Sequence, residues 1–325
     1  MANFDTSDAA YNAELRKFET ADPVHADTFN QVAEQLIKND VAIRNGIGLE
    51  STNSYSTSHK FPVLTGDGPA MVKQEDMVHI ILPNNAGTHN SIYRGKYLGS
   101  SVTSAQWAAI KAGTFDDLFI GDYWTIGGVN WRIAAFDYWL HCGDTECTTH
   151  HVVIVPDSCL YNAQMHNTAS GGWESSGNTT EGAYAGSDMR TKNLETAKST
   201  INSAFGSNHV LNHREHLQNA VTNGYASGGT WMDSTVELMS EEQVYGCMQF
   251  KPGNSLGSTI PNIYNIDYSQ FPLFRLNKAM ISNRAYWWLR DVASAAYFCL
   301  VTSYGTSNSS NASDSGGVRP AFGIC

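Results

Sequence analysis

Apolar residues recur at helical spacing near the N-terminus. Asp22 and Pro23 have the pattern of a helix N-cap followed by Pro at the first helical position. The apolar positions that follow fall on one helix face: Phe29, Val32, Ala33, Leu36, Ile37, Val41 and Ile43. Phe29, Leu36 and Ile43 also have the seven-residue spacing of a short coiled coil. One amphipathic helix is not stable alone in water. We therefore expect it to pack either on its own chain or on copies of itself.

The rest of the chain alternates short apolar runs with segments rich in Gly, Ser, Thr and Asn. Strands are expected over 77–82, over 118–140 around a Gly127-Gly128 turn, and over 151–155. A helix is expected over 103–112, with Ser104 as its cap and Gly113 as its stop.

The second half of the chain predicts one longer helix and a β-rich end. The helix covers 188–205, and its inward positions are Met189, Leu194, Ala197, Ile201 and Phe205. Shorter helical pieces are expected over 210–221 and 234–244, on either side of a strand. Residues 167–187 have the composition of an insertion on the surface, and 287–325 is β-like.

These elements predict an α+β protein of short antiparallel strands with peripheral helices. We expect three regions. Residues 1–50 form a helical attachment or oligomerisation segment, 51–115 form a linker with a small β/α connecting region, and 116–325 form the main domain.

The composition of the chain argues against several classes of protein. Only 16% of the 325 residues are charged, and the net charge of -11 argues against a nucleic-acid-binding surface. No apolar run approaches the length of a transmembrane helix, so no membrane insertion is expected. The N-terminus lacks the basic start and apolar run of a signal peptide, which predicts synthesis in a cytoplasm and no export by the Sec route. Six cysteines without CxxC spacing do not resemble a secreted disulfide framework.

One cluster contains residue types that bind metals. His141, Cys142, Cys147, His150 and His151 lie close together in the sequence. Three interpretations stay open: a polar turn between two strands, a zinc site, or a disulfide between the two cysteines. The spacing fits no common closed zinc site, which favours the polar turn.

Motifs of catalysis and of cofactor binding are absent. The chain has no G-x-S-x-G elbow, P-loop, G-x-G-x-x-G or EF-hand loop. The acidic pairs Asp144/Glu146 and Glu241/Glu242 have the character of solvated faces or of a helix first turn. We expect no cofactor, no metal and no catalytic residue.

The C-terminal segment carries the strongest signal. Residues 287–291 (WWLRD) and 317–324 (GVRPAFGI) have the bulky aromatics, single arginines and strand pattern of a framework. Between them, residues 297–316 (YFCLVTSYGTSNSSNASDSG) consist mostly of Ser, Thr, Asn, Asp, Gly and Tyr. This is the alphabet of antibody paratopes, in which Tyr provides rigid contact and the small polar residues adaptable hydrogen bonds.

WWLRD and GVRPAF resemble the C-terminal signature of phage and prophage proteins with a C-type-lectin-like fold. In particular, the chain resembles the variable proteins of diversity-generating retroelements. The segments GDYW…VNWRIAAFD (121–137) and THHVVIVPD (149–157) are similar to segments of related phage tail proteins, and residues 22–43 resemble the start of tail or baseplate-associated proteins. The resemblance covers most of the chain. It implies that 287–317 is a variable region copied with errors from a template.

The resemblance divides this region into two sets of residues. The framework would comprise Trp287, Trp288, Leu289, Arg290, Phe298, Val301, Gly305, Ala312, Ser313, Gly317, Val318, Arg319, Pro320 and Phe322. The ligand-facing, diversified positions would be Tyr297, Cys299, Leu300, Thr302, Ser303, Tyr304, Thr306, Ser307, Asn308, Ser309, Ser310, Asp314, Ser315 and Gly316. The Glu-Pro-Asn and Gln-Pro-Asp triplets of calcium-dependent lectins are absent, so no calcium site is expected.

The resemblance implies a non-enzymatic receptor-binding protein on a phage tail. It would be made in the bacterial cytoplasm and carried in the virion. Its partners would be a host cell-surface protein or glycan, other tail proteins, and further copies of itself, as in a trimer. Two alternatives stay open. One is a tail-associated enzyme that degrades a surface polymer through Asp137, Asp144 and Glu146, and the other is a purely structural virion protein.

Overall fold

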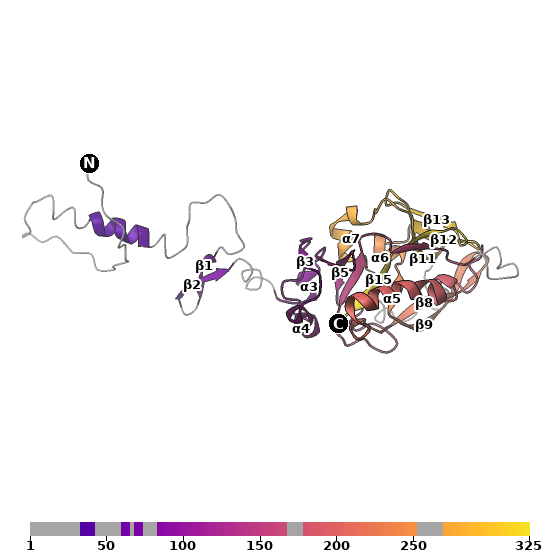
Figure 1. The fold of residues 1–325 in the computed structure, drawn as a ribbon, viewed down its shortest axis with the longest axis horizontal. Coiled ribbons are helices and arrows are strands. Elements are labelled where there is room, and N and C mark those ends of the chain that lie inside the picture. The colour runs from indigo at the N-terminus through magenta and orange to yellow at the C-terminus, as the bar shows by residue number, and fades with distance from the viewer. Residues whose placement is uncertain (1–32, 43–59, 66–67, 74–82, 168–177, 252–268) are drawn as a thin grey trace, which may run out of the picture. The chain divides into compact units, whose positions relative to one another are not determined.

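A computed structural model describes the chain except for residues 1–32, 43–59, 66–67, 74–82, 168–177 and 252–268 (Figure 1). The chain divides into two compact units, Met1–Pro83 and Asn84–Cys325. The second unit thus begins within the region expected to be a connector. The strand expected over 77–82 lies outside the described residues.

In the first unit, residues 33–42 are helical. The rest of the N-terminal helical segment lies outside the described residues, so the segment as a whole stays a prediction. The unit also contains one antiparallel hairpin, formed by β1 (Lys60–Thr65) and β2 (Gly68–Lys73).

The second unit is α+β, as predicted, and contains a six-stranded sheet, a five-stranded sheet and a separate two-stranded hairpin. The six-stranded sheet has the order β10 (Val236–Leu238), β15 (Pro320–Ile324), β6 (Val152–Pro156), β5 (Val129–Phe136), β4 (Tyr123–Ile126) and β3 (Tyr97–Gly99). The five-stranded sheet has the order β13 (Ser307–Asn311), β12 (Tyr297–Val301), β11 (Trp287–Val292), β14 (Gly316–Val318) and β7 (Tyr161–Ala163). The pairings β3–β4 and β11–β14 are parallel, and the other pairings are antiparallel. The 287–325 segment is therefore β structure, as predicted.

The helices of this unit are short. The α-helices are α3 (Ala86–His89), α4 (Ser104–Ala112), α5 (Leu194–Phe205), α6 (Glu241–Tyr245) and α7 (Pro272–Leu276). A π-helical turn, η2 (Met189–Asn193), leads into α5, and the 3-10 turns are η3 (Ser207–His209) and η5 (Lys278–Met280). In α4 the cap is Thr103 and not Ser104: Thr103 and Gln106 form a capping box, and Gly113 ends the helix in the left-handed conformation.

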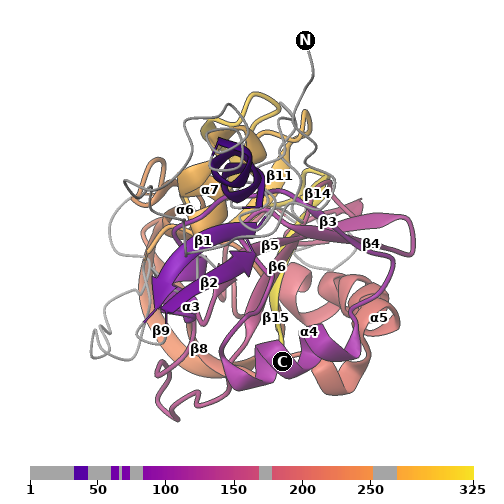
Figure 2. The same cartoon turned by 90° about the vertical axis from the view of Figure 1, so that its left-hand side faces the viewer.

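The helical prediction over 188–205 is confirmed, and all five residues expected to point inward are buried. At the end of α5, Phe205 packs edge-on against Trp131 of β5 and Phe322 of β15. Trp107 of α4 stacks on His209 in the turn after α5, and His209 Nδ1 lies 2.9 Å from the Cys325 carbonyl. In Figure 2, α4 and α5 accordingly lie near the C-terminus of the chain.

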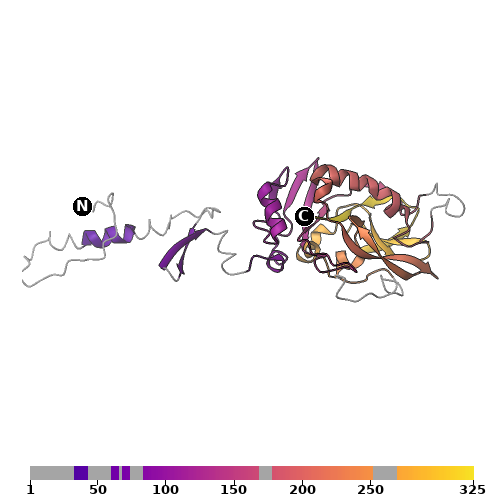
Figure 3. The ribbon, with the colours of Figure 1, turned by 90° about the horizontal axis from the view of Figure 1, so that it is seen from below.

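The structure corrects two predictions. Residues 210–221 are not helical, because β8 (His213–Thr222) pairs with β9 (Tyr225–Ser234) in a long hairpin. This hairpin lies beside β11 (Figure 3), where the Gln218 side chain of β8 accepts the Val292 backbone N–H at 3.4 Å. Of 234–244, only the end is helical, as part of α6. The sequence does contain a signal for the hairpin, namely the Asn223-Gly224 pair. In the structure both residues have positive φ, as a two-residue hairpin turn requires.

Residues 178–187 also depart from the prediction, because several of them enter the core instead of lying on the surface. Thr180, Ala183 and Tyr184 are buried. The Tyr184 hydroxyl donates to Glu237 at 2.8 Å and accepts from the backbone N–H of Leu238 at 2.8 Å. This segment therefore supports the six-stranded sheet at β10.

Candidate ligand-binding surface

The two C-terminal motifs form the buried frame of the five-stranded sheet and its neighbour. Trp287 and Trp288 of β11 are fully buried, and Trp288 Nε1 donates to the carbonyl of Ala163 at 2.9 Å. Arg319 is also buried. Its guanidinium lies 5.0 Å from the Trp287 ring centre and donates to the carbonyl of Pro156 at 2.8 Å. Burial lowers the pKa of Arg319 to about 10. These contacts fix both ends of the 287–325 segment.

Arg290 attaches this frame to the long hairpin. Its guanidinium bonds Glu215 of β8, whose other carboxylate oxygen lies 2.9 Å from His213 Nε2. Burial alone raises the pKa of Glu215, but the Arg290 charge and the His213 hydrogen bond outweigh burial and lower the pKa to about 2. The pair thus joins a buried carboxylate to a half-buried guanidinium, between two elements distant in sequence.

Asp291, the next residue, belongs to a second buried network. Lys251 Nζ donates to Asp291 at 2.8 Å and to Glu242 at 2.6 Å, and the backbone N–H of Glu241 donates to Asp291 at 2.6 Å. Burial raises the pKa of Asp291 despite the nearby Lys251. Burial also acts to raise the pKa of Glu242, but the Lys251 charge outweighs it and lowers that pKa. The network joins α6, the segment before residue 252, and β11.

The carboxylate of Glu241 holds two surface segments at once. It accepts backbone N–H groups from Gln249 at 3.0 Å, Phe250 at 2.9 Å and Lys251 at 3.0 Å, and it also accepts the Ser307 hydroxyl. Glu241 is fully buried. A single buried acid therefore positions both the Phe250 segment and the start of β13.

The polar part of the predicted variable region is β13 and the turn before it. β13 is an edge strand that pairs only with β12 among the described strands, with Tyr297 opposite Asn311 and Val301 opposite Ser307. Because side chains alternate along a strand, Tyr297 shares one face with Ser307, Ser309 and Asn311. In the turn, Tyr304 is 87% exposed. Asp314 accepts from the backbone N–H of Asn311 at 3.1 Å and from the Ser310 hydroxyl, which closes the far end of β13.

The predicted ligand-facing positions fall into two groups, one exposed or half-buried and the other buried. Exposed or half-buried are Tyr297, Ser303, Tyr304, Thr306, Ser307, Asn308, Ser309, Ser310, Asp314 and Ser315. Buried are Cys299, Leu300, Thr302 and Gly316. Burial contradicts the placement of these four on a ligand-facing surface. Both faces of β12 are covered, so Cys299 and Leu300 are inside, and burial raises the pKa of the Cys299 thiol well above its usual value.

Gly316 and Thr302 are buried for separate reasons. A Cβ at Gly316 would lie 2.7 Å from Trp288 Nε1, so a side chain there has no room. Thr302 closes the turn, since its backbone N–H donates to the Thr306 carbonyl at 2.8 Å and the two hydroxyls lie 2.7 Å apart.

Tyr297 also reaches a cleft of about 510 Å³. Two other exposed rings line this cleft. They are Tyr225, at the start of β9, and Phe250, which the Glu241 carboxylate positions. The rest of the lining comes from the loop between β11 and β12, residues 293–296, and from the Asn223-Gly224 turn. Sequence reasoning missed Tyr225 and Phe250, and only the Asn-Gly hairpin signal beside Tyr225 could have indicated one of them.

The Cys/His cluster forms a compact turn. His151 is buried, with Nδ1 2.9 Å from the Thr149 carbonyl and Nε2 accepting the Trp139 N–H at 3.0 Å. Burial lowers the pKa of His151 to about 3. Cys142 and Cys147 are not joined in a disulfide, and among the described residues no group of three His, Cys, Asp or Glu is arranged to hold a metal ion.

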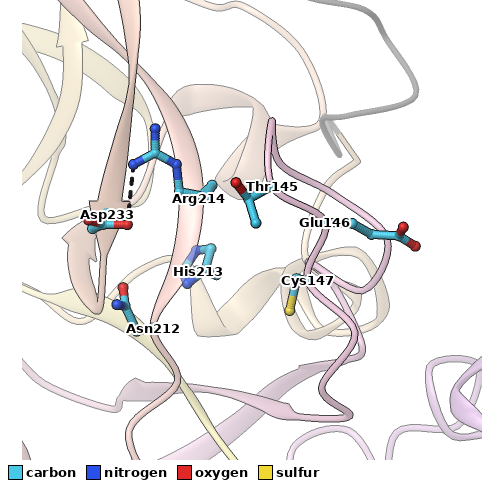
Figure 4. Close-up of a pocket in the computed structure, with 7 residues that line it drawn as sticks. All are labelled: Thr145, Glu146, Cys147, Asn212, His213, Arg214 and Asp233. Carbon is cyan, nitrogen blue, oxygen red and sulfur yellow. Dashed lines mark hydrogen bonds and ion pairs between the residues drawn. The ribbon is translucent and has the colours of Figure 1, made fainter.

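A second pocket, of about 290 Å³, adjoins this turn (Figure 4). It is lined by Thr145, Glu146, Cys147, Asn212, His213, Arg214 and Asp233. The His213 ring stacks on Trp139 with centroids 4.0 Å apart. Arg214 bonds Asp233 at 3.2 Å within the pocket and Asp144 at 2.7 Å beside it. The charged groups there are thus largely engaged with each other.

The three acids of the enzyme alternative occupy separate ion pairs. Asp137 accepts from His150 at 2.7 Å and from the backbone N–H of His151 at 2.9 Å. Asp144 pairs with Arg214, and Glu146 with His141 at 2.5 Å. Each acid is bonded to a different basic partner, which gives the enzyme alternative no support.

A family described as a domain of unknown function (DUF6273) matches residues 216–325. This range includes most of the long hairpin, the cleft residues and all of the C-terminal strands. Neither a curated protein nor a solved structure matches the chain. Within the described part of the chain, no helix has the length and apolar character needed to cross a membrane.

Proposed function

We propose that the protein is a phage tail-associated receptor-binding protein whose C-terminal unit has a C-type-lectin-like fold. Its ligand surface is the polar strand β13 with the turn before it and Tyr297, and a retroelement diversifies this surface. The observation that carries the proposal is the contrast between the strands of the five-stranded sheet. The edge strand β13 is rich in Ser and Asn and has exposed tyrosines near it, whereas β12 and β11 beside it are almost fully buried.

This arrangement separates variation from stability. Side chains at Tyr304, Thr306, Asn308 and Ser315 are exposed, so their replacement removes little buried area. The ends of the segment are held by Trp287, Arg290 and Arg319, which do not belong to the ligand-facing set. A rigid frame under adaptable polar positions is the requirement for a surface that changes its ligand and keeps its fold.

The tyrosines provide the expected contact energy. Tyr combines large apolar area with a hydroxyl and loses little conformational entropy, whereas Ser and Asn contribute weaker and adaptable hydrogen bonds. Binding through a surface of this kind gains from several copies on one tail. We therefore include self-association through residues 1–50 in the proposal.

Sequencing of the 3′ end of the gene in its native population tests the proposal. We expect substitutions at the exposed positions, such as Tyr304, Thr306 and Asn308, that trace to adenines in a nearby template. Cys299, Leu300 and Gly316 should stay constant because they are buried. A uniform 3′ end, or equal variation in the rest of the gene, would contradict diversification.

Adhesion tests the receptor-binding part separately. The labelled full-length protein should bind cells of host strains, and Tyr304→Ala should weaken this binding. The matched control is Tyr97→Ala, which removes another exposed tyrosine from β3, in the other sheet. Absence of binding to any host strain would overturn the receptor-binding function.

A further inference from the structure

We propose that the cleft between Tyr225, Phe250 and Tyr297 binds a neutral saccharide. The inference rests on the proposed function and deepens it, because it names the ligand class and places an anchoring subsite partly outside the variable region.

Three exposed aromatic rings converge on this cleft from three separate parts of the chain. Tyr225 is 55% exposed, Phe250 48% and Tyr297 42%. Single exposed apolar side chains are ordinary on protein surfaces, whereas several around one concavity mark a binding site. The flat faces of such rings suit the C–H faces of sugar rings, and the tyrosine hydroxyls add polar contacts at the rim.

Two segments that line the cleft are held in place before any ligand arrives. The Glu241 carboxylate accepts the Phe250 N–H together with those of its two neighbours. In the β11–β12 loop, the Ser294 carbonyl accepts the Thr180 hydroxyl at 2.9 Å, and the Ala295 carbonyl accepts the Thr180 N–H at 3.1 Å. Ordering that is complete before binding reduces the entropic cost of binding.

The hairpin turn that lines the cleft needs glycine. Gly224 has a φ of +82°, and a Cβ built on it would lie 3.1 Å from the Ala295 nitrogen. The hairpin turn therefore approaches the β11–β12 loop closely, and both segments line the cleft.

The chemistry of the lining selects a neutral ligand. The described residues that line the cleft include no Asp, Glu, Lys, Arg or His. Their polar side chains are those of Asn223 and Ser294 and the two tyrosine hydroxyls. A phosphate- or carboxylate-bearing polymer would meet no cation among these described residues, and the net charge of -11 opposes it further. Aromatic faces with a few neutral hydrogen-bonding groups match a neutral sugar.

Titration of the full-length protein with short neutral oligosaccharides of glucose, galactose, mannose and rhamnose tests the proposal. Poly(glycerol phosphate) and a mixed peptide library serve as the anionic and peptide arms. We expect saturable binding of at least one neutral oligosaccharide, weakened roughly tenfold by Phe250→Ala and by Tyr225→Ala. The control Tyr286→Ala removes a ring that is 52% exposed and lies outside the cleft lining, and it should leave the affinity unchanged. Thermal unfolding confirms that each variant is folded.

The proposal is overturned if no neutral oligosaccharide binds, if binding survives both cleft variants, or if the anionic polymer or a peptide occupies the cleft instead. These results leave the proposed function standing as long as the protein still adheres to host cells. Loss of adhesion to every host strain together with a uniform 3′ end would reject the proposed function, whatever the saccharide titration shows.

Discussion

The hydroxyl of Ser307 donates to the carboxylate of Glu241, a fully buried residue in helix α6. The same carboxylate accepts the backbone N–H of Phe250 at 2.9 Å. The polar edge strand and the aromatic cleft are therefore fixed by one buried acid, although the sequence places Ser307 among the variable positions. Ser307 thus connects the surface to its frame.

Replacement of Ser307 should therefore cost more than replacement of its neighbours. Ser307→Ala removes a hydrogen bond to a buried charge, and we expect a loss of about 1.5–3 kcal/mol in the free energy of unfolding. Asn308→Ala, at an exposed position of the same strand, should change it by less than about 0.5 kcal/mol. Urea denaturation of both variants measures the difference. Equal effects would show that the Glu241 contact contributes nothing specific.

Gly316 and Ser315 form a second matched pair. A Cβ at Gly316 would meet the Trp288 indole, whereas Ser315 is exposed. Gly316→Ala should destabilise the protein by about 1–3 kcal/mol through overpacking, and Ser315→Ala should leave stability nearly unchanged. Thermal unfolding is the readout, and wild-type stability of Gly316→Ala would argue against this packing.

His151 predicts loss of stability in mild acid. Burial lowers its pKa from 6.5 to about 3, so the unfolded chain takes up a proton that the folded protein excludes. The contribution of this group is complete above pH 6.5 and declines as the pH falls from 6.5 towards 3, by about 1.4 kcal/mol per pH unit. Urea denaturation from pH 7 to 4 measures the slope.

The variant His151→Gln provides the control for this slope. It removes the titrating ring, and we expect lower stability at pH 7 but a flatter dependence on pH below 6.5. A variant with the same slope as the wild type would assign the acid sensitivity to other groups.

Titration of Glu215 predicts a second pH range, below that of His151, in which the protein loses stability. The Arg290 charge overcomes the effect of burial and lowers the pKa of Glu215 from 4.5 to about 2. Its contribution is present above pH 4.5 and is lost as the pH falls towards 2. At neutral pH, Arg290→Gln leaves a buried charge without its partner, which should cost about 3–5 kcal/mol.

The exposed pair Arg214–Asp144 is the comparison for Arg290–Glu215. Both join β8 to another part of the unit, but Arg214 and Asp144 face solvent, which screens their attraction. Arg214→Gln should therefore change the urea midpoint far less than Arg290→Gln. Similar losses for both variants would show that burial does not decide the strength of these pairs.

Local patterns of the sequence determined much of the fold. Helical spacing identified the five buried positions of 188–205, and the Gly127-Gly128 pair identified the turn between β4 and β5. The bulky ends at 287–291 and 317–324 indicated a frame around a polar segment. These features follow from neighbours along the chain, namely side-chain periodicity and the dihedral angles that glycine permits.

Only the tertiary structure decided which residues form the candidate site. Composition marks Cys299 and Ser309 as equal members of one polar segment, but strand pairing places Cys299 inside and leaves Ser309 at the edge. The cleft requires Tyr225, Phe250 and Tyr297 to meet, and the buried Glu241 holds Phe250 in place. Burial and pairing depend on contacts between distant segments, and no local pattern specifies those contacts.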